Sequence, residues 1–497
     1  MRVGYGLLLA YVGASLCPTS DRDSVHDSTP AAAAARVAGP GSSGYILFSP
    51  LLSTVTYLID TKGRVVHIWE GDFPPGASAY LLDNGLLLRP ARDPALSFFS
   101  GGGQGGRIQE FTRAGDLVWD FVVASNQTMQ HHDVAPLPNG NVLALVWERK
   151  SRQQAIWAGR RPELVSGAGL WPDGVLEIAP QPPTGGKIVW EWHVWDHLIQ
   201  DQDPARPSYG TVSDHPELVD INADQAPPTL TAEALERLQA LGYVQRGASP
   251  RDLQADYLHT NSIAYNPWLD QIALSVSRLN ELWVIDHSTT TAEAAGHSGG
   301  RTGRGGDLVY RWGNPGTYGR GLAEHQRLFG QHDVRWIPAG LPGAGNLMVF
   351  DNGAGRPGEA YSSVLELTPP LAGGGSYTLL PGVAFGPAKP TWTYTARNRR
   401  SFFADFVSGA HRLPNGNTFI CSGPSGRFFE VTPQGDTVWE YHNPFSGDAP
   451  NPAGDPPRSV FRATHLPPQH PALAGRTLRP LVPQPPLLDT KASHRKR

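Results

Sequence analysis

The sequence predicts an all-β fold, a six-bladed β-propeller with an inserted, partly helical segment. Two recurring hairpins and a high content of turn-forming residues lead to this prediction. Glycine (56) and proline (46) make up about a fifth of the 497 residues, which is typical of short strands joined by tight turns. The same composition excludes a helical bundle or a coiled coil.

The first hairpin alternates apolar and polar residues, turns at Gly, Pro or Asp, and continues into an apolar pair and an aromatic residue. It occurs six times, at 57–69, 108–121, 175–192, 282–312, 364–394 and 428–441. Each copy carries a tryptophan that we expect to pack between blades: Trp69, Trp119, Trp190, Trp312, Trp392 and Trp439.

The second hairpin occurs five times, at 79–90, 133–147, 262–277, 333–350 and 410–423. Three copies turn at an Asn-Gly pair, which is a strong hairpin signal. Two hairpins make a four-stranded antiparallel sheet, and six such sheets packed radially form a propeller. One copy of the second hairpin is missing, and we place the gap between the third and fourth copies of the first hairpin.

The propeller is expected to span 45–465, interrupted by an insertion at 193–256 that covers one face. The insertion contains a predicted helix, Leu230–Leu241, with Thr231 as its N-cap and leucines on one stripe. Before the propeller, 1–20 has a positive start and an apolar run typical of a signal peptide, so we expect an exported protein. Residues 21–44 are a predicted low-complexity linker, and 466–497 a disordered Pro-rich and basic tail.

Composition and absent motifs exclude several classes of protein. The net charge of −4 disfavours a nucleic-acid binder, and no apolar run reaches the ~18 residues of a membrane span. Two cysteines cannot build a disulfide framework. The glycines at 101–106 lack the strand and helix that frame a nucleotide loop, so we interpret them as a flexible segment. No cofactor is predicted.

Three histidines occupy the same position in three copies of the second hairpin. His132 and His259 each lie seven residues before a turn asparagine, and His332, like His132, lies six residues before a turn proline. This position begins the innermost strand, so the three should converge at one mouth of the central channel. In the last copy Ser408 holds this position, and His411 lies three residues further on, an offset that turns it to the other face unless a bulge intervenes. Since His-Asp recurs at 132–133 and 332–333, a capping role within the repeat is the alternative.

Arginines follow the second strand of four of these hairpins: Arg149, Arg278, Arg356 and Arg427. Arginine beside histidine at a channel mouth suits an anion such as sulfate, phosphate or carboxylate. We expect solvated loop ends at Arg149 and Arg427, the latter pairing within its own blade. Arg356, which closes Phe-Asp-Asn-Gly-Ala-Gly-Arg, is the preferred ligand contact.

Several of these segments together resemble the arylsulfotransferases of the arylsulfate-dependent class. The resemblance runs from about 45 to 445 and rests on HHDVAPLPNGNVLAL (131–145), DYLHTNSIAYNPWLDQIALSV (256–276), GDLVYRWGNP (306–315), GQHDVRW and GNLMVFDNGAGR (330–356), and SGAHRLPNGNTFICSGPSGRFFEVTPQGDTVWEY (408–441). It implies an exported six-bladed propeller that moves a sulfuryl group from a phenolic sulfate ester to another phenol without a nucleotide donor.

The resemblance also implies a histidine nucleophile that becomes sulfated, with further histidines and an arginine around the sulfate. By motif, His259 matches the His-x-Asn-Ser position, His332 the Gln-His position and Arg356 the Asp-Asn-Gly-x-Gly-Arg position. It places the nucleophile in the blade after that last motif, where His411 is the only histidine of the hairpin. His332, His259 or a loss of catalysis are the alternatives.

The resulting prediction is an aryl-sulfate sulfotransferase whose partners are small aryl sulfates and phenols. An imidazole supplies a neutral nitrogen nucleophile, and a second histidine protonates the leaving phenolate. The predicted residues are, as catalytic, His332, His259, His411 and Arg356, and, as substrate-binding, His132, Asn261 and Arg278. A propeller enzyme with a His-ligated Fe²⁺ or Zn²⁺ is one alternative, which Arg356 in the site disfavours. A binding scaffold without chemistry is another.

Overall fold

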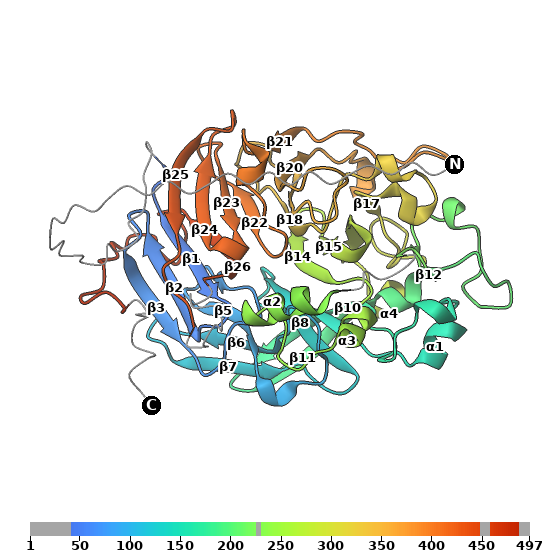
Figure 1. The fold of residues 1–497 in the computed structure, drawn as a ribbon, viewed down its shortest axis with the longest axis horizontal. Coiled ribbons are helices and arrows are strands. Elements are labelled where there is room, and N and C mark those ends of the chain that lie inside the picture. The colour runs from blue at the N-terminus through green and yellow to red at the C-terminus, as the bar shows by residue number, and fades with distance from the viewer. Residues whose placement is uncertain (1–40, 225–229, 448–457, 487–497) are drawn as a thin grey trace, which may run out of the picture. The chain divides into compact units, whose positions relative to one another are not determined.

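The computed structural model describes residues 41–224, 230–447 and 458–486, and over these residues it is a six-bladed β-propeller, as predicted (Figure 1). Each blade is a four-stranded antiparallel sheet whose first strand lies nearest the central channel. The predicted signal peptide at 1–20 lies outside the described residues. None of the helices that the structure describes is long and apolar enough to cross a membrane.

The first three blades, with strands named from the channel outward, are as follows. Blade 1 contains β26 (Val460–Leu466), β1 (Tyr45–Pro50), β2 (Val55–Asp60) and β3 (Val65–Glu70). Blade 2 contains β4 (Tyr80–Leu81), β5 (Leu87–Arg92), β6 (Gly106–Phe111) and β7 (Leu117–Val122). Blade 3 contains β8 (Thr128–Pro136), β9 (Val142–Glu148), β10 (Asp173–Gln181) and β11 (Gly185–His193).

The remaining blades repeat this arrangement. Blade 4 contains β14 (Thr260–Asn266), β15 (Gln271–Val276), β16 (Glu281–Asp286) and β17 (Tyr310–Trp312). Blade 5 contains β18 (His332–Trp336), β19 (Leu347–Asp351), β20 (Ser363–Leu367) and β21 (Trp392–Tyr394). Blade 6 contains β22 (Gly409–Arg412), β23 (Thr418–Ser422), β24 (Arg427–Val431) and β25 (Thr437–His442).

The missing second hairpin belongs to blade 1, so its predicted place between the third and fourth copies of the first hairpin was wrong. The inner pair of blade 1 joins β26, near the end of the described chain, to β1, with Tyr45 opposite Leu466. Because the two strands are distant in sequence, no hairpin turn marks them. Their pairing closes the ring and gives blade 1 its fourth, innermost strand.

The recurring tryptophans lie between blades, as predicted, and they also link one blade to the next. Each indole N–H donates to the outer-hairpin turn of the following blade, at 2.7–3.1 Å. The acceptors, in blade order, are Thr112, Gly185, Thr289, Pro387, Pro433 and, in blade 1, Thr61. The last bond, from Trp439, completes the circle.

The insertion between β11 and β14 contains the short parallel pair β12 (Leu198–Ile199) and β13 (Val219–Asp220) and the helices α2 (Ala232–Ala240) and α3 (Pro250–Ala255). The hydroxyl of Thr231 accepts from the Ala234 N–H at 3.2 Å, which is the predicted N-cap. Two further short helices, α1 (Arg152–Trp157) and α4 (Thr291–Ala294), lie in loops. Leucines of α2 pack with Phe406 and Phe461, so the insertion covers one mouth of the channel.

The segment after β26 is ordered further than the sequence predicts. Leu473 is buried against blades 1 and 2, and the Gln484 side chain bonds both the N–H and the carbonyl of Val65. The prediction of a disordered tail from 466 is therefore wrong up to 486, because scattered leucines in this Pro-rich stretch find an apolar surface. Ser42, from the predicted linker, bonds Glu430 of blade 6.

Candidate active site

The structure brings His132, His259 and His332 together at the channel mouth under the insertion. They come from three adjacent blades, at the start of β14 and β18 and within β8. All three first strands are irregular there, and His132 and His259 have left-handed backbones with φ of 51° and 53°. Such a conformation is costly for a residue other than glycine, and it turns the imidazoles into the channel.

His132 and His259 form one hydrogen-bonded chain through Tyr243 of the insertion. Their ring centroids lie 4.5 Å apart, and each Nε2 lies 2.9 Å from the Tyr243 hydroxyl. The Nδ1 atom of His259 lies 2.5 Å from the buried carboxylate of Asp256, and the Nδ1 of His132 lies 2.8 Å from that of His131. A proton can therefore move between groups that are already in contact.

Burial and neighbouring groups shift the pKa values of Asp256 and His132. Burial pushes the pKa of Asp256 upward, but His259 and Arg278 outweigh it and hold the pKa below its usual value. Burial, together with the nearby histidines, lowers the pKa of His132 well below normal. The carboxylate of Asp256 thus stays charged beside His259 and orients its imidazole through the bond to Nδ1.

His332 is held as a neutral imidazole whose Nε2 carries no proton. The side-chain amide of Asn352 donates to the carbonyls of Ala404 and Val407, so its oxygen is left to accept the Nδ1 proton of His332 at 2.8 Å. The Nε2 atom accepts a long bond of 3.2 Å from the Val407 N–H. Burial lowers the pKa of His332 to about 3, so the ring stays neutral at physiological pH.

A cavity of about 360 Å³ opens beside these residues. His259, His332 and Arg278 lie in its polar wall, and one N–H of Arg278 donates to the Leu253 carbonyl at 2.9 Å. Asp405 also lines the cavity, and its carboxylate is paired with Arg237 of α2. The apolar wall consists of Leu230, Leu238 and Leu253 of the insertion together with Phe406. An apolar wall facing a cation and two imidazoles suits an aromatic ester that carries one negative group.

Two predicted site residues, Arg356 and Asn261, make contacts away from the cavity. Arg356 pairs with Asp351 and stacks between the rings of Phe329 and Tyr361, at 4.6 and 4.4 Å, and it does not line the cavity. The buried amide of Asn261 donates to the Gln331 carbonyl at 2.8 Å and so joins blade 4 to blade 5. Arg278, not Arg356, is the arginine beside the histidines. Arg427 pairs with Glu440 within its blade, as predicted.

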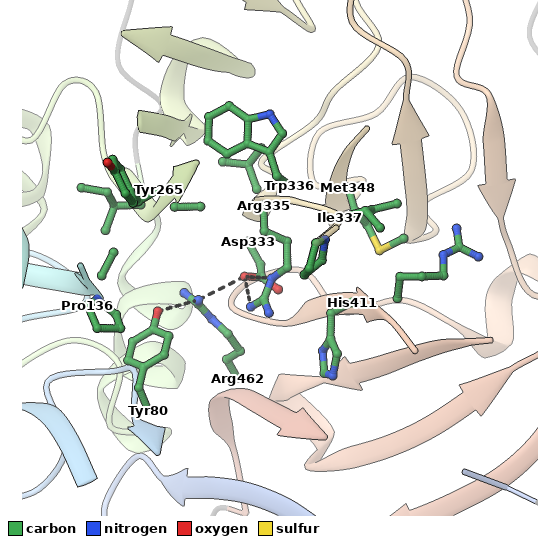
Figure 2. Close-up of a pocket in the computed structure, with 16 residues that line it drawn as sticks. Tyr80, Pro136, Tyr265, Asp333, Arg335, Trp336, Ile337, Met348, His411 and Arg462 are labelled. Carbon is green, nitrogen blue, oxygen red and sulfur yellow. Dashed lines mark hydrogen bonds and ion pairs between the residues drawn. The ribbon is translucent and has the colours of Figure 1, made fainter. Parts of the chain in front are cut away.

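His411 lies in a different cavity, of about 300 Å³, shown in Figure 2. It faces Arg335 and Asp333 there, and its Nε2 accepts from the His465 N–H at 3.1 Å. Burial and Arg335 lower its pKa to about 3. The suggestion that a bulge carries His411 to the channel mouth is not met, because β22 pairs regularly with β23 at this residue.

The aspartates that follow two of the histidines have a structural role. Asp133 accepts from the Ile263 N–H of blade 4, and Asp333 accepts from the Ala410 N–H of blade 6. Arg462 of β26 bridges both carboxylates, at 2.6 and 3.1 Å. The capping interpretation of the His-Asp repeat therefore holds for the aspartates. Of the two histidines, His332 lines the cavity, and the fully buried His132 bonds Tyr243 behind it.

The channel histidines are not arranged as a metal site. The Nε2 atoms of His132 and His259 share a tyrosine hydroxyl, and that of His332 accepts a backbone N–H. Among the described residues, the group whose ligand atoms come within 4.8 Å of one another is His197, His297 and Asp307, none of which lines the cavity.

Sequence reasoning missed Tyr243, Asp256 and Asn352, and it misjudged the glycines at 101–106. The glycines pack closely rather than forming a flexible segment. The Gly103 carbonyl accepts from the His132 N–H at 2.6 Å, and the Gly103 N–H donates to the Tyr243 carbonyl at 3.2 Å. Gly103 has a φ of +73°, and a Cβ there would lie 2.2 Å from the His132 ring.

We expect Gly103→Ala to displace His132 and to reduce turnover of any substrate in this cavity by at least about tenfold, since small misplacements of site residues are costly. Gly115→Ala is the matched control, because Gly115 also has a positive φ but has no atom within 4 Å of the added Cβ. Thermal melting of both variants separates backbone strain, which they share, from the contact with His132. Equal activities would contradict the tight fit at Gly103.

The profile of the arylsulfotransferase (ASST) family matches residues 46–443. The chain belongs to the arylsulfotransferase family. The match runs from β1 to β25, so it leaves out β26 of blade 1 but includes every residue that lines the cavity. No curated protein shows significant similarity to the chain.

Solved structures similar to this arylsulfotransferase-family chain are remote in sequence. A protein of unknown function from Bacteroides caccae has 11% identity and a TM-score of 0.42, with 81% of this chain and 94% of that one covered. The periplasmic gluconolactonase PpgL of Pseudomonas aeruginosa has 11% identity and a TM-score of 0.38, covering 81% and 96%. Apo AztD of Citrobacter koseri has 8% identity and a TM-score of 0.35, covering 86% and 99%.

Proposed function

We propose that this protein transfers a sulfuryl group from an aryl sulfate ester to a phenol by way of a covalent intermediate on His332. One observation carries the proposal: His332, a neutral imidazole whose Nε2 carries no proton, lines the same cavity as Arg278 and His259. The family match supports the substrate class.

In the first half-reaction the Nε2 of His332 attacks the sulfur of the ester. An N–S bond forms as the bond from sulfur to the phenolic oxygen breaks, and the departing phenolate takes a proton from His259, which Asp256 supports. Arg278 faces the sulfuryl oxygens with its remaining donors. The ester group replaces the long Val407 contact at Nε2.

In the second half-reaction a phenol attacks the sulfur on His332. The phenolic proton passes to His259, the S–O bond forms, and the N–S electron pair returns to Nε2. The same residues serve both directions because donor and acceptor are both phenols, so one site suffices for a ping-pong cycle. The hydrogen bond from Nδ1 to Asn352 fixes the tautomer throughout.

The test is to incubate the purified protein with 4-nitrophenyl sulfate, with and without added phenol. We expect a short burst of nitrophenolate alone and sustained release only with phenol, together with a sulfuryl adduct on the tryptic peptide 328–335, which contains His332 and no tyrosine, serine or threonine. Turnover that disappears with chelator and returns with Fe²⁺ or Zn²⁺ would favour the metal alternative. Binding of the ester without any release would favour the scaffold.

A further inference from the structure

The insertion carries a phenol of its own into the candidate active site. Tyr243 is buried beyond the end of α2, and its hydroxyl lies 2.9 Å from Nε2 of both His132 and His259. Its ring packs 5.2 Å from that of Phe406, and its backbone is bonded to Gly103. Tyr243, His259 and His332 line the same cavity, so the tyrosine that is bonded to His259 adjoins the space that His332 borders.

A buried tyrosine hydroxyl can donate one hydrogen bond and accept others, so the chemistry of its partners indicates its role. Here the hydroxyl lies between two imidazoles, one of which is supported by a carboxylate. That is the environment an attacking phenol needs, because one imidazole can take its proton while the oxygen bonds to sulfur. Burial raises the pKa of Tyr243, so the proton must leave as the new bond forms, which requires a base already in contact.

We infer that Tyr243 is an internal sulfuryl acceptor that becomes O-sulfated when no external phenol is present. The inference rests on the proposed function, since the sulfuryl group comes from His332. The Tyr243 oxygen bonds to sulfur, the N–S bond to His332 breaks, and its electron pair returns to Nε2. The phenolic proton passes to His259. The product is a tyrosine sulfate, whose charge Arg278 faces across the same cavity.

Sulfation of Tyr243 also changes the site. The neutral hydroxyl that joins His132 to His259 becomes an anionic ester, so the hydrogen-bonded chain between the two histidines is broken. The insertion is held over the mouth by this tyrosine and by the α2 leucines. The position from which an external phenol would attack is therefore taken by the Tyr243 side chain, whether or not it is sulfated.

The experiment uses the full chain with 4-nitrophenyl sulfate and no added phenol. The tryptic peptide 238–246 contains Tyr243 and no other hydroxyl or imidazole group, so a sulfuryl adduct on it must lie on that residue. We expect this adduct, and a burst of about two equivalents of nitrophenolate, one for Tyr243 and one for His332. Tyr243→Phe should lower the burst to about one equivalent and leave the adduct on 328–335.

Tyr209→Phe is the matched control, because Tyr209 lies in the same insertion but is 52% exposed. It should keep both adducts. His332→Ala should remove the adduct from 238–246, and its persistence there would overturn transfer from His332. An adduct on 328–335 with an unmodified 238–246 would overturn the inference and leave the proposed function standing. No adduct and no release would reject both. A melting curve for Tyr243→Phe shows that the loss is chemical and not a loss of fold.

Discussion

Replacing His332 with alanine is expected to reduce sulfuryl transfer by at least about 10²-fold and to remove every covalent adduct. His332 differs from the other imidazole that lines the cavity. Asn352 holds the His332 proton on Nδ1, and Nε2 accepts only a long hydrogen bond from a backbone N–H. His259 is bound at both nitrogens, by Asp256 and Tyr243. The measurement is steady-state turnover of 4-nitrophenyl sulfate with phenol, paired with peptide mapping.

His411→Ala is the matched control for this prediction. His411 is also a neutral imidazole with a low pKa, but it is half-buried and lines the second cavity (Figure 2). We expect it to keep the adduct on His332 and to turn over within a few-fold of the unchanged protein. An adduct that survives in His332→Ala and disappears in His411→Ala would reinstate His411 as the nucleophile.

The rate of adduct formation should also depend little on the protonation of His332 between pH 8 and about pH 5. Because burial lowers its pKa to about 3, the nucleophile is neutral across this range and becomes protonated only near that value. A single-turnover rate that falls along a titration near pH 6.5 would mean that a group with an ordinary histidine pKa limits the step.

The propeller and the position of three site histidines could be predicted because both depend on local repeats. A hairpin turn fixes the register of its strands, so residues at one distance from the turn occupy one place in every blade. His132, His259 and His332 follow that rule. The inner pair of blade 1 does not, because β26 and β1 meet only when the ring closes.

The rest of the site depends on where irregular segments dock, which no repeat encodes. The helix containing Leu235 was predictable from its N-cap and apolar stripe, but its place over the channel was not. Tyr243 therefore had no sequence signal beyond lying in the insertion. The choice between Arg278 and Arg356 failed for a similar reason: both follow a second strand, and only the fold shows that Arg356 turns back onto Asp351.

The second large effect is expected on replacing Arg278. Arg278→Ala should lower kcat/KM for aryl sulfate by about 10²-fold, because it removes a charge that faces the sulfuryl oxygens as they separate from the phenol. Arg278→Lys should recover part of the loss, since a lysine keeps the charge without the planar fork. The pH profile of the burst should keep its shape in both, because His332 and His259 remain in place.

Arg356→Ala should instead retain most of the turnover and lower the stability of the fold. Its guanidinium pairs with the buried Asp351 between two aromatic rings, and removing one partner of such a pair typically costs about 3 kcal/mol or more. Urea unfolding measures that loss, and kcat/KM below the transition measures the chemistry. If Arg356→Ala lost transfer at full stability while Arg278→Ala kept it, the anion would bind beside the Asp351 loop, and the cavity under the insertion would not be the site of sulfuryl transfer.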